Sequence, residues 1–365
     1  MAQQRDRIAG FDGLRAIAFL LVFASHKLSI DHAGVYGDIG VWMFFALSGF
    51  LITRILVNAR ADIEAGGSTF VASLRKFYIK RTARIFPIYY LVLLFFVVLS
   101  WFTSVDNFWF NARASYFLFL TNLFIGLRNA WVGDFGHLWT LAVEEQFYLL
   151  FAPLVLWLPR SRTQALCLAF IAVGVLTKVV MELLGAPPTS TDVNSLTNFA
   201  LLGFGGLVGL NVDRKAPAWV SSGPAQVAAG VCFVGLAVVF GAYETQWMRY
   251  AKITVLLAGL ILFQVYNRPQ TGFVRFLDSA PLRRVGRVSY GAYLFHHFIH
   301  MSDLRGALLA HGLDPLVPPW LDPLGELAIT LALAAVSWAV LERPAIAWAS
   351  RVAGTERATG RLRAS

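Results

Sequence analysis

The stretch FDGLRAIAFLLVFASHKLSI, residues 11–30, decides how the rest of this chain is interpreted. At about 1.5 Å per residue, its apolar part is long enough to cross a bilayer as a helix. Ionisable side chains near the centre of such a helix are disfavoured by roughly 2.5–3.5 kcal/mol each, so they face protein or water. Asp12 and Arg15 are neighbours on a helix, and His26 follows Arg15 by about three turns on the same face. We therefore predict that this face points into the protein.

The histidine near the end of this helix has two interpretations. A neutral imidazole at His26 can accept the proton of a substrate hydroxyl, because imidazoles titrate near neutrality. A buried histidine can equally be structural, with its hydrogen bonds satisfied inside a helix bundle. The helix alone does not separate these two interpretations.

The composition excludes an ordinary soluble protein. Of 365 residues, 57% are hydrophobic and 14% are charged, and the mean hydropathy is +0.62, whereas soluble domains are about a quarter charged. We predict an all-α, polytopic integral membrane protein in the lipid bilayer. The net charge of +10 comes from basic residues between apolar runs, as in cytoplasmic loops, so we expect no nucleic-acid partner.

Ten apolar runs are predicted to span the membrane, and the basic clusters between them place both termini in the cytoplasm. These runs are residues 11–30, 38–57, 85–102, 137–158, 165–184, 196–211, 218–242, 249–266, 287–303 and 323–341. The stretch 116–127 is too short to cross easily and is interpreted as a re-entrant or interfacial piece. We expect residues 1–344 to form one membrane domain and residues 345–365 a short, basic, disordered cytoplasmic tail.

Two arginines lie one helical turn apart in FYIKRTARIFPIYY, at the predicted inner mouth of the third span. The guanidinium groups of Arg81 and Arg84 can together grip phosphate oxygens. Basic residues at this depth also anchor a protein to acidic lipid head groups, which requires no particular spacing. Both interpretations remain open on spacing alone.

Adjacent carboxylates inside the apolar run HLWTLAVEEQFYLLFAPLVLW favour a functional role. Glu144 and Glu145 are costly there unless they are paired or protonated. One of them can orient an imidazole from another helix, in the usual arrangement of a base and the group that positions it.

Histidines also recur in SYGAYLFHHFIH, where His296 and His300 have a spacing that can bind a metal. No HExxH motif accompanies them, so we expect no metal. A polar cavity lining or structural histidines explain this segment better.

Six motifs occur in one order along nearly the whole chain: FDGLRAIAFLLVFASH, FFALSGFLI, the RTAR of FYIKRTARIFPIYY, HLWTLAVEEQFYL, YLFHH and the terminal LERP. Together they resemble the acyltransferase-3 family of integral membrane acyltransferases, which modify extracytoplasmic glycans, lipids or small natural products. The resemblance implies that His26 is the catalytic histidine and Arg15 its functional partner. It implies that Arg81 and Arg84 meet the acyl-CoA donor, and that Glu144 occupies an acidic position of the family pattern.

We also expect these residues to surround a polar cavity. His296 matches the histidine of the family's YLxH-like motif, with His297 as the neighbouring alternative. Asp12, Glu145 and Tyr148 join His296 as candidates to line the substrate cavity.

The expected reaction moves an acyl group, acetyl by default, from cytoplasmic acyl-CoA to a hydroxyl of an extracytoplasmic or lipid-linked acceptor. In this mechanism His26, oriented by Glu144 or a neighbour, removes the hydroxyl proton or carries the acyl group transiently. Carbohydrate, glycolipid and small natural-product acceptors, macrolide-like ones included, remain possible, and the sequence leaves the oligomeric state open. The family resemblance implies the bacterial inner membrane. Some members carry an esterase-like domain after the membrane part, so we expect this chain to act alone or with a separate protein.

The main alternative is a transporter or flippase for a glycan, lipid or acyl-bearing solute. In that case the intramembrane charges would line a solute pathway. Such proteins commonly show internal two-fold repetition and broken helices in corresponding halves, and neither is visible in this sequence.

Overall fold

The computed structural model describes residues 8–28, 34–102, 107–213, 217–242, 253–267, 270–311 and 318–363. Within these ranges every regular element is a helix, which confirms the all-α prediction. Five helical segments are long and apolar enough to cross a membrane: Val35–Glu64, Phe70–Leu99, Gly133–Trp157, Arg160–Leu183 and Pro319–Gly354. The count of ten spans and the cytoplasmic placement of the termini remain predictions.

The chain divides into two compact units. The first comprises Met1–Leu47 and Asn211–Ala335, and the second Ser48–Leu210 and Val336–Ser365. The helices of the first unit are α1 (Phe11–Lys27), the first half of α2 (Val35–Glu64), α10 (Gly223–Ala242), α12 (Ile253–Asn267), α13 (Gly272–Leu277), α14 (Ala280–Arg287), α15 (Ser289–Phe295), the 3₁₀ helix η5 (His296–Phe298), α16 (Met301–Ala310), the 3₁₀ helix η6 (Pro319–Leu321) and most of α17 (Asp322–Ser337).

The second unit contains the remaining helices. These are the second half of α2, α3 (Phe70–Leu99), α4 (Asn107–Phe117), α5 (Thr121–Arg128), the 3₁₀ helix η2 (Gly133–Leu138), α6 (Trp139–Trp157), the 3₁₀ helix η3 (Arg160–Arg162), α7 (Thr163–Leu183), α8 (Pro188–Val193), nearly all of α9 (Ser195–Asn211), the π-helical turn η7 (Trp338–Glu342) and α18 (Arg343–Arg363).

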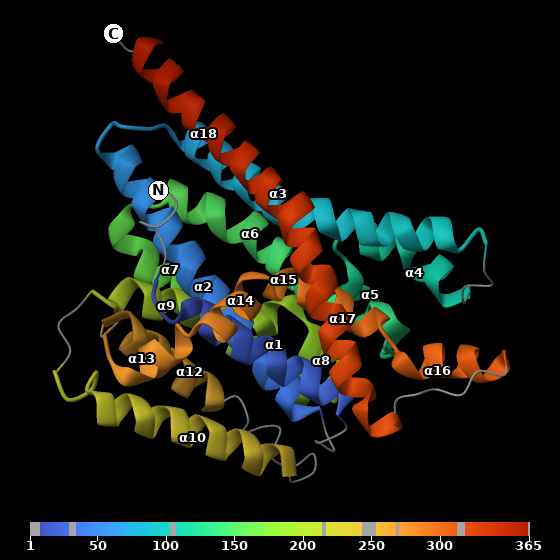
Figure 1. Ribbon diagram of the computed structural model, residues 1–365. Coiled ribbons are helices and arrows are strands. Elements are labelled where there is room, and N and C mark those ends of the chain that lie inside the picture. The colour runs from blue at the N-terminus through green and yellow to red at the C-terminus, as the bar shows by residue number, and fades with distance from the viewer. Residues whose placement is uncertain are drawn as a thin grey trace. The chain divides into compact units, whose positions relative to one another are not determined.

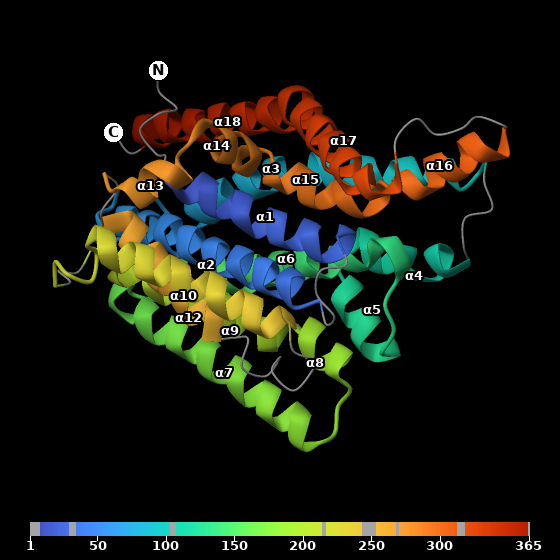
Figure 2. The ribbon, with the colours of Figure 1, turned by 60° about the horizontal axis from the view of Figure 1, so that its bottom comes forward.

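In the first unit, α1 packs against α13, α14 and α15, and α10 lies beside α12 (Figure 2). The start of α1 meets its neighbours backbone to backbone. A Cβ on Gly13 would lie 2.1 Å from the carbonyl oxygen of Leu277, and one on Gly286 would lie 1.7 Å from that of Asp12. Glycine at both positions therefore permits the close approach that fixes the start of α1.

In the second unit, α3 runs beside α18 (Figure 1) and packs against α6, while α5 packs against α6 and α8. The second half of α2 approaches α9 closely at Gly49, where a Cβ would lie 1.9 Å from the carbonyl oxygen of Leu202.

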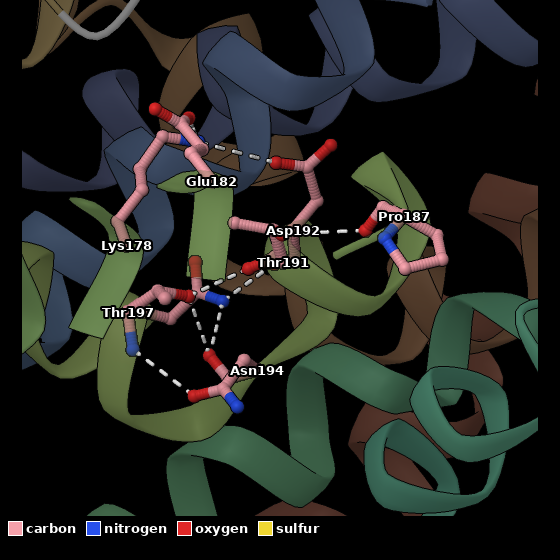
Figure 3. Close-up of polar contacts among 8 residues, drawn as sticks. Lys178, Glu182, Pro187, Thr191, Asp192, Asn194 and Thr197 are labelled. Atoms are coloured by element: carbon pink, nitrogen blue, oxygen red, sulfur yellow. Dashed lines mark hydrogen bonds and ion pairs between the residues drawn. The ribbon is translucent and has the colours of Figure 1, made fainter. Parts of the chain in front are cut away.

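Figure 3 shows the corner at which α7, α8 and α9 meet. Asn194 caps α9, because its Oδ1 accepts the backbone N–H of Thr197 at 3.3 Å and its carbonyl accepts the Thr197 hydroxyl at 2.8 Å. Lys178 lies 3.2 Å from Glu182 and 3.7 Å from Asp192. The polar residues of this corner thus serve to join three helices.

The third predicted span begins earlier than expected. α3 starts at Phe70, with Thr69 as its N-cap accepting the backbone N–H of Ala72 at 3.2 Å. Residues 75–84 are mostly good helix formers, so the helix runs through the basic segment. Arg81 and Arg84 consequently lie inside this helix.

The ninth predicted span is interrupted. α15 ends at Phe295, η5 follows, and Ile299 is extended (φ −107°, ψ 108°) before α16 begins at Met301. The backbone N–H of Met301 donates to Glu326 Oε1 at 2.8 Å, which satisfies one of the donors left open at the start of α16. The break places two histidines, His296 and His297, in non-α-helical backbone.

The predicted tail is helical where the structure describes it. α18 continues to Arg363, and Ala349 and Ala353 on it are buried, with α3 as the neighbouring helix. Alanine is the strongest helix former, and a small apolar face allows packing. The cytoplasmic location of this segment and the domain boundary at residue 344 remain predictions.

Candidate functional site

Three histidines come together in the first unit. His26 lies in the last turn of α1, and His296 and His297 form the start of η5. His26 Nδ1 is 3.1 Å from His296 Nε2, and the ring of His26 lies 4.6 Å from that of His297, centroid to centroid. His296 is fully buried, His297 is half-buried and His26 is exposed. The cluster is therefore anchored on its inner side and accessible at His26.

The hydrogen bonds of His296 define the tautomers of the pair. His296 Nδ1 is 2.6 Å from the carbonyl oxygen of Tyr293, and a carbonyl can only accept, so Nδ1 carries the hydrogen. In a neutral ring Nε2 of His296 then accepts, and the hydrogen between the two rings belongs to His26 Nδ1. The lone pair of neutral His26 is consequently on Nε2.

A buried ion pair stands next to this cluster. Lys27 Nζ lies 3.2 Å from Glu326 Oε2 and donates to the carbonyl of Ile299 at 2.7 Å, and both charged side chains are less than a tenth exposed. Because Glu326 also accepts the N–H of Met301, the pair ties α1, α17 and the residues after η5 together. Neither residue was predicted as a site residue from the sequence, although Glu326 is a carboxylate inside the last apolar run.

Asp12 and Arg15 form the predicted pair at the start of α1. Arg15 Nη1 lies 3.4 Å from Asp12 Oδ1, and both side chains are mostly buried. Eleven residues of helix separate Arg15 from His26, which is about 16 Å along the axis. The two charged groups thus share a helix with His26 without touching it.

In the second unit a carboxylate is held by two hydroxyl donors. Ser48 Oγ donates to Glu144 Oε1 at 2.7 Å, and Tyr148 Oη donates to Glu144 Oε2 at 3.0 Å. The Arg81 guanidinium lies over the rings of Tyr148 and Phe77, at 5.6 and 5.8 Å from their centroids. Glu144, Tyr148 and Arg81 therefore form one polar set. The contact between Ser48 and Glu144 was not predicted from the sequence.

Glu145 and Arg84, which follow Glu144 and Arg81 in sequence, have different surroundings from that pair. Oε1 of Glu145 is buried and has no hydrogen-bond partner among the described residues. Arg84 interacts electrostatically with Glu144 and with Glu342, a buried carboxylate that accepts the Ser337 hydroxyl at 3.1 Å. Each arginine of the pair thus has a carboxylate near it.

A groove of about 960 Å³ lies along α3 and α18. Its lining is mainly apolar and includes Tyr78, Tyr90 and Trp348, with Arg75 as its charged residue. Neither Arg81 nor Arg84 lines it, so the arginine pair belongs with Glu144 rather than with this groove.

The predicted site residues therefore form three sets. His26 and His296 meet in the first unit, Asp12 pairs with Arg15 in the same unit, and Glu144, Tyr148 and Arg81 meet in the second. Within the first unit the hydrogen-bond partner of His26 Nδ1 is His296. The expectation that Glu144 orients His26 relates residues of different units and remains a prediction.

The described residues form helices, and five helical segments are long and apolar enough to cross a membrane, as expected of a membrane-embedded protein. Residues 8–342 match a family described as an acyltransferase domain, and the chain belongs to this acyltransferase-3 family. The resemblance inferred from the six motifs is confirmed, and so is the assignment as an acyltransferase enzyme.

The chain is also similar to curated proteins of bacteria. It is 30% identical to peptidoglycan O-acetyltransferase OatA of Listeria monocytogenes, over 93% of this chain and 56% of the relative. It is 29% identical to putative peptidoglycan O-acetyltransferase YrhL of Bacillus subtilis, over 94% of this chain and 55% of the relative. It is 25% identical to O-acetyltransferase OatA of Staphylococcus aureus, over 92% of this chain and 57% of the relative.

The chain spans little more than half the length of these relatives. No solved structure matches it.

Proposed function

We propose that this chain is a membrane-embedded O-acetyltransferase that moves an acetyl group from acetyl-CoA to a hydroxyl of a cell-wall carbohydrate. Three relatives are named O-acetyltransferases, and two of these names specify peptidoglycan, which makes a glycan of that class the leading acceptor. The observation that carries the proposal is the hydrogen-bond chain from His26 through His296 to the carbonyl of Tyr293.

The chain of hydrogen bonds gives His26 the form that an acyl transfer requires. The acceptor hydroxyl gives its proton to His26 Nε2 while its oxygen bonds to the thioester carbonyl carbon. The carbon–sulfur bond then breaks, and the CoA thiolate takes the proton back from the imidazolium. The products are an acetyl ester and free CoA, and His26 returns to its starting tautomer. A transient acyl group on His26 Nε2 is the alternative route and uses the same lone pair.

The second unit supplies the groups proposed to meet the donor. Arg81 and Arg84 are one turn apart on α3 and are suited to the phosphates of CoA. The hydroxyl donors of Ser48 and Tyr148 keep Glu144 in one orientation, so that its charge stands in a fixed place beside Arg81. In this proposal the donor approaches from the cytoplasm and the acceptor from the outer side of a bacterial inner membrane.

The transporter alternative keeps one supporting observation, the break in the helix at His296 and His297. Broken helices line the substrate sites of many transporters. Membership of an acyltransferase family favours the enzyme.

The test uses the purified chain in nanodiscs with acetyl-CoA, in the presence and absence of peptidoglycan fragments, and measures release of free CoA. We expect acceptor-dependent release that falls at least about 100-fold in His26→Ala, since a general base contributes 10²–10⁴-fold. Arg84→Ala should raise KM for acetyl-CoA. The matched control is His300→Ala, which removes a partly exposed histidine located 3.9 Å from Asp303.

Two outcomes would contradict the proposal. One is full turnover in His26→Ala. The other is a wild-type protein that releases no CoA with any glycan acceptor, in which case solute uptake into proteoliposomes should be measured next.

A further inference from the structure

We propose that His26, His296 and His297 bind one divalent transition-metal ion of the Zn²⁺ type, and that this ion blocks the proposed base by fixing the wrong tautomer of His26. One ring nitrogen from each of the three histidines lies within 4.8 Å of the other two. Neutral imidazoles are the ligands that Zn²⁺, Cu²⁺ and Ni²⁺ prefer, whereas Mg²⁺ and Ca²⁺ prefer oxygen. The cluster comes from two segments, α1 and η5, so it forms only in the folded unit.

The distances approach those of a metal centre. With Zn–N bonds of about 2.0–2.1 Å, tetrahedral ligand nitrogens lie roughly 3.3 Å apart. His26 Nδ1 and His296 Nε2 are already 3.1 Å apart. Only His297 must move to complete three ligands, and its ring is half-buried at the start of η5.

His296 also has the surroundings of a metal ligand. A ligating histidine usually donates its other ring N–H to a carboxylate or a backbone carbonyl, which sets the tautomer and orients the ring. His296 Nδ1 donates to the carbonyl of Tyr293 at 2.6 Å, so its Nε2 lone pair points at the cluster. The tautomer and the orientation that His296 needs as a ligand are therefore already set without the ion.

The charges around the cluster tolerate a cation. The ammonium of Lys27, next in sequence to His26, lies 3.2 Å from the carboxylate of Glu326. Glu326 largely offsets its charge, so this ammonium group opposes metal binding only weakly. His300, four residues after His296, lies 3.9 Å from Asp303 and belongs to a separate pair.

Binding changes where the proton of His26 resides. In the metal-free pair Nδ1 of His26 carries the hydrogen and Nε2 carries the lone pair. For Nδ1 to ligate an ion, that hydrogen must move to Nε2, and no net proton is released. Nε2 then donates instead of accepting, so His26 cannot take a proton from the acceptor hydroxyl. The metal site does not depend on the proposed function. The inhibition does, because it blocks the base of that function.

The first measurement is metal binding without any substrate. A chain without a polyhistidine tag is reconstituted in nanodiscs and titrated with Co²⁺, whose visible absorption reports a low-symmetry nitrogen site. We expect about one ion per chain, competition by Zn²⁺, and at least a tenfold weaker affinity in His297→Ala and in His296→Ala. His300→Ala should bind like the wild type. No cobalt band, or an unchanged band in His297→Ala, would overturn the site.

The second measurement is CoA release with added Zn²⁺, each variant being compared with its own metal-free rate. Wild type should lose most of its turnover near the Zn²⁺ concentration that displaces Co²⁺ and regain it with EDTA. His297→Ala should need at least ten times more Zn²⁺ for the same fractional loss. Binding without inhibition would overturn the tautomer block and leave the site standing, whereas absent turnover in metal-free wild type would count against the proposed function alone.

Discussion

His26 and His296 are joined by a hydrogen bond between His26 Nδ1 and His296 Nε2. His296 has one nitrogen on a carbonyl and one on His26, so a neutral His296 accepts from His26 and cannot donate to it. In the proposed mechanism, His296 is a positioning residue that raises turnover by keeping His26 in one tautomer and one orientation.

Replacing His296 should therefore lower kcat more than it alters donor binding. We expect His296→Ala to reduce kcat for CoA release at least about tenfold with KM for acetyl-CoA nearly unchanged, because the base loses its orienting acceptor. His296→Gln can place a carbonyl oxygen near the former Nε2 and should recover part of the loss. Equal falls in kcat and folded yield, without rescue by glutamine, would indicate a structural role instead.

Glu144 is held by Ser48 and Tyr148, and removing either donor leaves a carboxylate oxygen short of a partner. Ser48→Ala and Tyr148→Phe should each lower the free energy of unfolding by roughly 1–3 kcal/mol. The double variant should lose less than the sum, since both act on one carboxylate. Thermal unfolding in detergent measures this, with Ser68→Ala near the α2–α3 turn as the control. Strict additivity would contradict a shared role.

Contacts between side chains were predicted correctly from the sequence where the two residues are a few positions apart on one helix. The neighbours Asp12 and Arg15 were predicted from a separation of three residues, and they do meet. His26 and His296 are separated by 270 residues, and no helical period relates such positions. Composition likewise cannot reveal that Lys27 meets Glu326.

At the scale of the element, α1 depends on bare backbone at its first turn. Gly13→Ala would place a Cβ 2.1 Å from the carbonyl oxygen of Leu277, so α1 must shift away from α13. We expect a loss of about 3 kcal/mol or of the folded protein altogether. The control is Gly235→Ala in α10, where a Cβ meets nothing within 4 Å and helix propensity should improve. Differential scanning fluorimetry compares the two, and equal melting temperatures would refute the close-approach argument.

The Lys27–Glu326 pair holds three segments together, and breaking it should cost more than removing it. Lys27→Met or Glu326→Gln alone leaves one buried charge without its partner, for which roughly 3–5 kcal/mol is expected. Lys27→Met with Glu326→Leu should recover part of that loss, because no unpaired charge remains. Recovery is incomplete, since Ile299 and Met301 lose backbone partners. Thermal unfolding and CoA release check this, and a double variant no better than either single one would argue against the pairing.

Elements were predicted well where an apolar run is uniform and poorly where it is not. α7 and α9 begin within two residues of the predicted spans. The break after Phe295 was missed because SYGAYLFHHFIH is apolar on both sides, and the contact of Met301 with Glu326 at the start of α16 joins residues far apart in the sequence. The start of α3 was missed because hydropathy marks the lipid-exposed length rather than the helix.

At the scale of the whole molecule, the predicted threading is tested by labelling. In a Cys232→Ser background, Ala65→Cys should be protected from a membrane-impermeant maleimide in intact cells, and Leu127→Cys should react. Both positions are exposed, so reactivity reports the side of the membrane. Lysed cells should label at both positions. Reaction of Ala65→Cys in intact cells would reverse the predicted orientation.

The discontinuous first unit has a consequence for biosynthesis. α1 leaves the ribosome well before the partner of His26, which follows 270 residues later. At roughly 5–20 residues per second, that interval is on the order of 15 to 50 seconds. During this time the polar face of α1 must be sheltered by lipid head groups, water or an insertase. The order of synthesis thus exposes the charges of α1 before its partners exist. We therefore expect cells with impaired membrane insertion to lose this protein early. Proteins whose first helix packs against the next helices in sequence should be lost later.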